Sequence, residues 1–180
     1  MKKTLLAGLL AFLLAVSCAQ AETRTQTYEI FEDSIDFTVT RYHSEEMLLS
    51  FWYDAEFLTV EDGMSESGNS VILYPADPEY SLPVHMEFIL PEWDETHTLH
   101  YLETAPEAME LETLSSISLF MTEGGLAAAY RFGYANGLEY RFMALWNNAG
   151  HVNIFFQQPI GEYDDVLLRL DALLATVQFE

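Results

Sequence analysis

Apolar and polar residues alternate with a period of two along several segments of this 180-residue chain, and this pattern sets narrow limits on its fold. Ile35, Phe37 and Val39 alternate with polar residues, and similar patterns run through residues 84–90, 126–134 and 138–146. Successive side chains of a strand point to opposite faces, so this period is typical of half-buried strands. Shorter apolar runs predict further strands at 48–53, 71–74 and 152–157.

Two segments have the longer period of a helix. Thr104 and Glu107 form a capping-box pattern with Pro106 in the first turn, which predicts a helix that begins at Thr104. Near the C-terminus, apolar residues between Val166 and Val177 predict an amphipathic helix.

The two long alternating segments meet at Ala135-Asn136-Gly137, which is turn chemistry. A two-residue Asn-Gly turn sets the apolar face of one strand against the polar face of the next. A three-residue loop instead aligns Tyr134 with Leu138 and places Arg131 opposite Arg141. Since a shift of one residue exchanges the two faces, the apolar pattern favours the three-residue loop.

This order of elements predicts an α+β fold, a mostly antiparallel sheet covered by helices. A strand meander is followed by the C-terminal amphipathic helix. We expect a single domain over residues 28–180, preceded by a flexible lead-in at 22–27, because repeats and linker-like tracts are missing from the sequence.

The N-terminus has the layout of a secretory signal peptide over residues 1–21. Lys2 and Lys3 precede an uncharged apolar run, and small residues follow it. Two cleavage sites fit. Cleavage after Ala21 is ordinary processing, whereas lipidation of Cys18 would make the chain a lipoprotein, although Ala15 stands where such signals usually carry Leu. The sequence therefore predicts export to the periplasm, the medium or the cell envelope, and membrane attachment only through a lipid on Cys18.

Charge excludes several partners. Beyond residue 21 the chain has no lysine, and five arginines against 29 acidic residues give a net charge of −24. Such a domain repels nucleic acid and anionic lipid, and it favours cationic partners such as a basic protein surface. Cys18 is the only cysteine, so an intrachain disulfide is excluded.

A resemblance to a known group of proteins rests on three short segments. They are 122–128 (TEGGLAA), 161–165 (GEYDD) and Leu174-Ala175-Thr176-Val177. In pattern, the chain resembles small exported bacterial lipoproteins with the PsbP-like sandwich fold. The resemblance implies an accessory or assembly role without shared catalytic residues.

Two candidate ligand sites stand out. Glu92, Asp94, His97 and His100 are spaced closely enough to offer nitrogen and oxygen ligands to a divalent metal, although the segment also fits a solvated connection. The opposed guanidinium groups of Arg131 and Arg141 could hold a carboxylate, or a neighbouring acid could cover them.

These observations predict a non-enzymatic exported accessory or binding domain that presents an acidic surface to a protein partner. The alternative is a small-ligand binder that holds a metal at His97/His100 or an anion at Arg131/Arg141. A hydrolase comes third, because the nearest serine motif, residues 63–67, lacks its second glycine. The sequence offers no catalytic residue and no resident cofactor.

Overall fold

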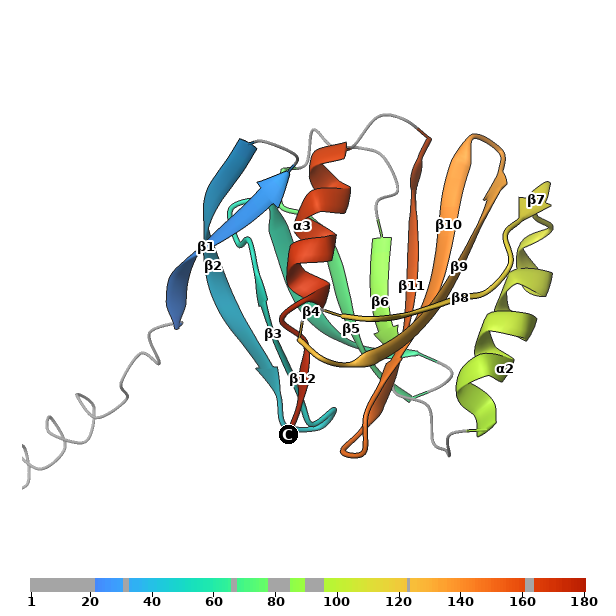
Figure 1. The fold of residues 1–180 in the computed structure, drawn as a ribbon, viewed down its shortest axis with the longest axis horizontal. Helices are drawn as coiled ribbons and strands as arrows, with labels where there is room; N and C mark the ends of the chain where they lie inside the picture. Colours follow the sequence, from blue (N-terminus) through green and yellow to red (C-terminus); the bar gives the residue numbers. More distant parts are fainter. Residues whose placement is uncertain are drawn as a thin grey trace, which may run out of the picture.

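A computed structural model describes residues 22–30, 33–65, 68–77, 85–89, 96–122, 124–160 and 164–180. Within these residues the chain forms two antiparallel sheets, two short α-helices and one 3₁₀ turn (Figure 1). The predicted signal peptide, Cys18, Glu92 and Asp94 lie outside the described residues.

The smaller sheet joins the start of the domain to its last residues. Its strand order is β1-β2-β3-β12, and every pairing is antiparallel. The strands are β1 (Thr23–Ile30), β2 (Asp33–Ser44), β3 (Leu49–Tyr53) and β12 (Gln178–Phe179).

The larger sheet has the order β4-β5-β6-β11-β10-β9-β7, and β8 also pairs with β9. Its strands are β4 (Leu58–Ser65), β5 (Gly68–Pro75), β6 (His85–Ile89), β7 (Thr113–Leu114), β8 (Ser118–Met121), β9 (Ala127–Ala135), β10 (Leu138–Trp146) and β11 (His151–Pro159). In Figure 1 this sheet curves away from the smaller one, and helix α3 (Asp164–Leu174) lies across the opening between them.

The main core fills the space between the two sheets and α3. Phe51 of β3 stacks on Phe88 of β6 with ring centroids 5.1 Å apart, which ties the sheets together. From α3, Leu170 and Leu173 are buried in the same cluster, together with Val177 just beyond it. The inner face of the large sheet is the face turned toward this core.

Helix α2 (Thr96–Thr104) covers the outer face of the large sheet at β9, β10 and β11. Leu102 is fully buried against Ala129 of β9 and Phe142 of β10. Strands β9 and β10 therefore have protein on both faces, α2 on one side and α3 with the smaller sheet on the other (Figure 1).

The predicted α+β class was wrong. Twelve strands stand against two short α-helices and one 3₁₀ turn in the described chain, so the fold is β-rich and not a sheet layered with helices. The sequence pattern missed β1, β4, β7, β8 and β12. Most of these are edge or very short strands, whose period-two signal is weak.

The predicted register of the β9–β10 hairpin was also wrong. The chain turns through Asn136 and Gly137 alone, with φ angles of 52° and 77°, and Ala135 pairs with Leu138. Phe132 therefore stands opposite Arg141. Alignment of the apolar faces of the two strands was the wrong criterion for the register. Protein covers both faces of β9 and β10, so neither face has to be polar.

Three local expectations also differ from the structure. Residues 23–30 form β1, so the expected lead-in at 22–27 is mostly strand. Glu61-Asp62-Gly63, a tripeptide whose composition is typical of a turn, lies inside β4. Thr104 is the last residue of α2 and does not begin a helix there, because Pro106 disfavours an α-helical conformation at Ala105. The Thr104 hydroxyl donates a hydrogen bond to the His100 carbonyl one turn earlier.

Among the described residues, no helix has the length and apolar character required to cross a membrane.

Candidate functional site

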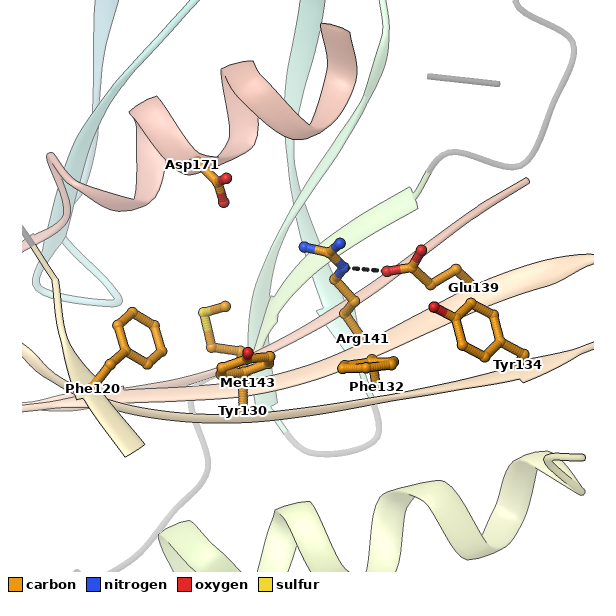
Figure 2. A pocket seen from close by; sticks show the side chains of 8 residues that line it. All are labelled: Phe120, Tyr130, Phe132, Tyr134, Glu139, Arg141, Met143 and Asp171. Atoms are coloured by element: carbon orange, nitrogen blue, oxygen red, sulfur yellow. Dashed lines mark hydrogen bonds and ion pairs between the residues drawn. The ribbon is translucent and has the colours of Figure 1, made fainter. Parts of the chain in front are cut away.

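A hollow lies between α3 and the inner face of β9 and β10 (Figure 2). Its volume of about 310 Å³ is at the small end of the range for ligand pockets. We call it the aromatic lobe. Its lining residues are Phe120 of β8, Tyr130, Phe132 and Tyr134 of β9, Glu139, Arg141 and Met143 of β10, and Asp171 of α3.

Among the described residues, Arg141 is the one cation that lines the aromatic lobe. Its Nε donates to Glu139 Oε1 at 2.5 Å, and the two side chains are 30% and 12% exposed. This contact holds the guanidinium in place through Nε alone. Within the described residues, the two terminal nitrogens have no hydrogen-bond acceptor, and Figure 2 shows them directed into the space below α3.

Aromatic rings form the floor of the lobe. The tight Asn136-Gly137 turn places Phe132 beside Arg141 and Tyr134 beside Glu139 on the inner face. Phe132 and Tyr134 contact edge to face at 5.8 Å between ring centroids. In Figure 2 the rings of Tyr130 and Phe132 lie nearly flat on the sheet, with a face turned toward α3. Such faces bind flat or apolar groups and also attract cations.

Asp171 contributes a second carboxylate from the opposite wall. Figure 2 shows its side chain pointing from α3 toward the sheet, across the lobe from the Arg141 guanidinium. Desolvation by the surrounding protein raises the pKa of the Asp171 carboxyl, and the positive charge of Arg141 opposes part of that rise. In the described structure the Asp171 carboxylate makes no hydrogen bond or ion pair, so it faces the lobe without a direct partner there.

A second hollow of about 300 Å³ adjoins the first and shares Phe120, Met143 and Asp171 with it. Its other lining residues are Met121, Thr122, Leu174 and Ala175. We call this the apolar lobe, and the two lobes together the α3 groove. The groove thus has an end with fixed charges and an end that is mainly apolar.

The predicted arginine pair does not form. Arg131 stands on the outer face of β9, and Arg141 stands on the inner face of β10. Arg131 donates to the Ser115 carbonyl from Nε and Nη2, at 3.1 and 2.7 Å, and to the Leu102 carbonyl from Nη1 at 3.1 Å. Its role is to fasten α2 and the following loop to the sheet, which leaves Arg141 alone as a candidate ligand contact.

Most of the predicted metal ligands lie outside the part of the molecule that the structure describes. His100 lies on α2 with its side chain exposed, while the side chain of His97 lies outside the described part of the molecule. No group of three or more potential metal ligands occurs among the residues that the structure describes.

The aromatic lobe contains residues that the sequence analysis did not assign to a site. From the sequence, Tyr130, Phe132 and Tyr134 are assigned only to the apolar face of the strand predicted at 126–134. Asp171 was one of many acids on a helix pattern. The available signal was Glu139 and Arg141 alternating with apolar residues on β10, together with the Asn-Gly turn that places them beside the aromatic face of β9.

Comparison of the chain with protein-family models, with curated proteins and with solved structures finds no match. The resemblance to the PsbP-like group stays a prediction that nothing here tests.

Proposed function

We propose that this is an exported binding protein that holds a small carboxylate-bearing organic molecule in the α3 groove. The observation that carries the proposal is Arg141. Its guanidinium is oriented by Glu139, and its two terminal nitrogens face an aromatic-lined hollow without an acceptor among the described residues. Two parallel N–H groups match the two oxygens of a carboxylate.

The placement of this charge supports a binding role. The Arg141 side chain is only 30% exposed, and the rings beneath it are part of a folded sheet, so the site is organised before a ligand arrives. A site of this kind loses little conformational entropy on binding. Export is supported by Lys2, Lys3 and the apolar run that follows them.

The test is the thermal stability of the purified protein against benzoate, 3-phenylpropionate, L-leucine and L-phenylalanine. A ligand that binds only the folded chain raises Tm in proportion to RT ln(1 + [L]/Kd). We expect at least one carboxylate to raise Tm and Arg141→Lys to weaken its affinity at least tenfold. Lysine keeps the charge but lacks the planar fork.

Arg24→Lys is the matched control, because it makes the same change at an exposed arginine that lies over Trp52, at 4.1 Å from the ring centroid. It should leave affinity unchanged. The proposal fails if none of the four carboxylates stabilises the protein, or if Arg141→Lys binds as tightly as the unaltered chain.

A protein partner is the second candidate function, and the observation that favours it is strand β8. Leu119 and Met121 on this strand are 71% and 63% exposed, which is unusual for large apolar side chains on an edge strand. If β8 contacts a partner, Leu119→Glu should abolish the partner's cross-linking while ligand binding by the groove is retained. Retained cross-linking in that variant would exclude β8 as the contact.

A further inference from the structure

Among the residues that the structure describes, the aromatic lobe contains more negative than positive charge, and this restricts the ligand further than a single arginine does. Two of these described residues, Glu139 and Asp171, present carboxylates to the one described guanidinium, that of Arg141. Glu139 already accepts a hydrogen bond from Arg141, whereas the Asp171 carboxylate makes neither a hydrogen bond nor an ion pair in the described structure. A ligand with a carboxylate alone would add negative charge beside Asp171. A ligand with an ammonium alone would leave the two terminal nitrogens of Arg141 unfilled.

We propose that the ligand is an apolar α-amino acid, with its carboxylate on Arg141, its ammonium beside Asp171 and its side chain in the apolar lobe. This inference rests on the proposed function and names the ligand class of the same site. An apolar α-amino acid carries its ammonium and its carboxylate on the same carbon, Cα, and has no net charge at neutral pH. It satisfies both walls of the lobe without changing the balance of charge.

The position of the two charged groups fits this assignment. Arg141 rises from the sheet and Asp171 descends from α3, so the space between them is bounded by opposite charges (Figure 2). The two side chains form no direct ion pair, although their charges interact. The faces of Tyr130 and Phe132 beneath this space add attraction for an ammonium group.

The apolar lobe supplies side-chain selectivity. It begins at Phe120 and Met143, which it shares with the aromatic lobe, and continues to Met121 and Leu174. An apolar side chain placed there is removed from water, which favours binding in proportion to the apolar surface that it buries. We therefore expect L-leucine, L-methionine and L-phenylalanine to bind at least tenfold more tightly than L-serine.

Calorimetric titration with three matched compounds separates the contributions of the two charges. L-phenylalanine has both groups, 3-phenylpropionate lacks the ammonium, and 2-phenylethylamine lacks the carboxylate. We expect L-phenylalanine to bind at least tenfold more tightly than either of the others. In Asp171→Asn this advantage over 3-phenylpropionate should disappear. Glu103→Gln, which removes an exposed acid from α2 on the other face of the sheet, should preserve it.

Each outcome has a distinct meaning. If 3-phenylpropionate binds as tightly as L-phenylalanine, the amino-acid assignment is overturned and the carboxylate site on Arg141 stands. If 2-phenylethylamine binds as tightly as L-phenylalanine, both proposals are overturned, because the carboxylate then contributes nothing. If none of L-leucine, L-methionine and L-phenylalanine binds, the amino-acid assignment is overturned, and binding of 3-phenylpropionate or benzoate decides whether the broader proposal survives.

Discussion

The chemistry of the groove depends on individual side chains whose surroundings give them different roles. Arg131 and Arg141 lie ten positions apart on paired strands, yet one binds backbone carbonyls on the outer face and the other faces a hollow on the inner face. Residue type alone could not separate these roles. The face on which each arginine lies depends on the register of β9 and β10.

Asp171 gives a prediction about pH. Its pKa is raised above the ordinary value of 3.8, so between these two pKa values the folded chain binds a proton that the unfolded chain has released. Stability therefore falls as pH rises through this window and stays lower above it. Asp171→Asn removes the effect. It should raise Tm at pH 7 and leave Tm nearly unchanged at pH 3, as measured by calorimetric melting.

A lower Tm of Asp171→Asn at pH 7 would contradict this prediction. If Asp171→Asn lowers Tm at pH 7, the ionised carboxylate must be stabilising in the folded chain through the charge of Arg141. Desolvation would then not be the dominant influence on this group.

At the scale of elements, the hairpin turn decides which side chains share the inner face. Asn136 and Gly137 both have positive φ, as a two-residue turn of type I′ requires, whereas the three-residue loop needs this only of Gly137. Asn136→Ala should therefore lower the free energy of unfolding by about 1 kcal/mol, because alanine tolerates the left-handed region poorly. Urea denaturation measures the change.

Asn136→Gly is the matched control for this prediction. Glycine adopts positive φ without a steric penalty, so this variant should keep at least the stability of the unaltered chain. Equal stability of all three proteins would contradict the two-residue turn and the register that places Arg141 beside Phe132.

Helix α3 gives a second prediction at this scale, because its attachment sets the upper wall of the groove. Arg169 Nε donates to Asp54 Oδ2 at 2.8 Å, and the Asp54 side chain is only 6% exposed. The guanidinium also lies over Phe57, at 4.3 Å from the ring centroid. Asp54→Ala should cost about 3 kcal/mol, since it removes one member of a largely buried ion pair.

The measurement is again urea denaturation, with Asp36→Ala as a control on an exposed acid of β2. Asp36 accepts a hydrogen bond from Thr27 at the surface, so a much smaller loss is expected there. Similar losses in the two variants would mean that the Asp54–Arg169 contact does not anchor α3.

The elements show how far the sequence could predict the fold. Period-two patterns located β2, β6, β9 and β10, and short apolar runs located β3, β5 and β11, because each of these strands has buried residues. The predicted α+β class was wrong because edge strands such as β1 and β8 lack that alternation and were missed. The two predicted helices therefore counted for too much in the prediction. The groove could not be predicted, since it forms where α3 and the β9–β10 face meet across distant parts of the chain.

At the scale of the whole molecule, charge is the dominant feature. The chain has a formal charge of −22 at pH 7, and self-repulsion of this size destabilises a compact state. Raising NaCl from about 0.02 M to about 0.3 M shortens the screening length to well below 10 Å. Tm should therefore rise with salt over this range, as followed by circular dichroism.

The few exposed ion pairs act in the opposite direction but are weak. Arg41 contacts Glu180 at 2.9 Å and Glu22 at 3.5 Å, and screening should remove only a small contribution from each pair. A fall in Tm with added NaCl would show that such attractive pairs outweigh the general repulsion.

The proposed ligand contact is between the terminal nitrogens of Arg141 and the carboxylate of a small molecule in the α3 groove. The proton–nitrogen NMR spectrum of the arginine side chains reports on this contact during titration with L-phenylalanine, with Arg141→Lys used to assign the Arg141 signal. We expect this signal to shift in proportion to ligand occupancy while those of Arg24 and Arg41 stay in place. A ligand that binds and leaves the Arg141 signal unchanged would exclude the contact.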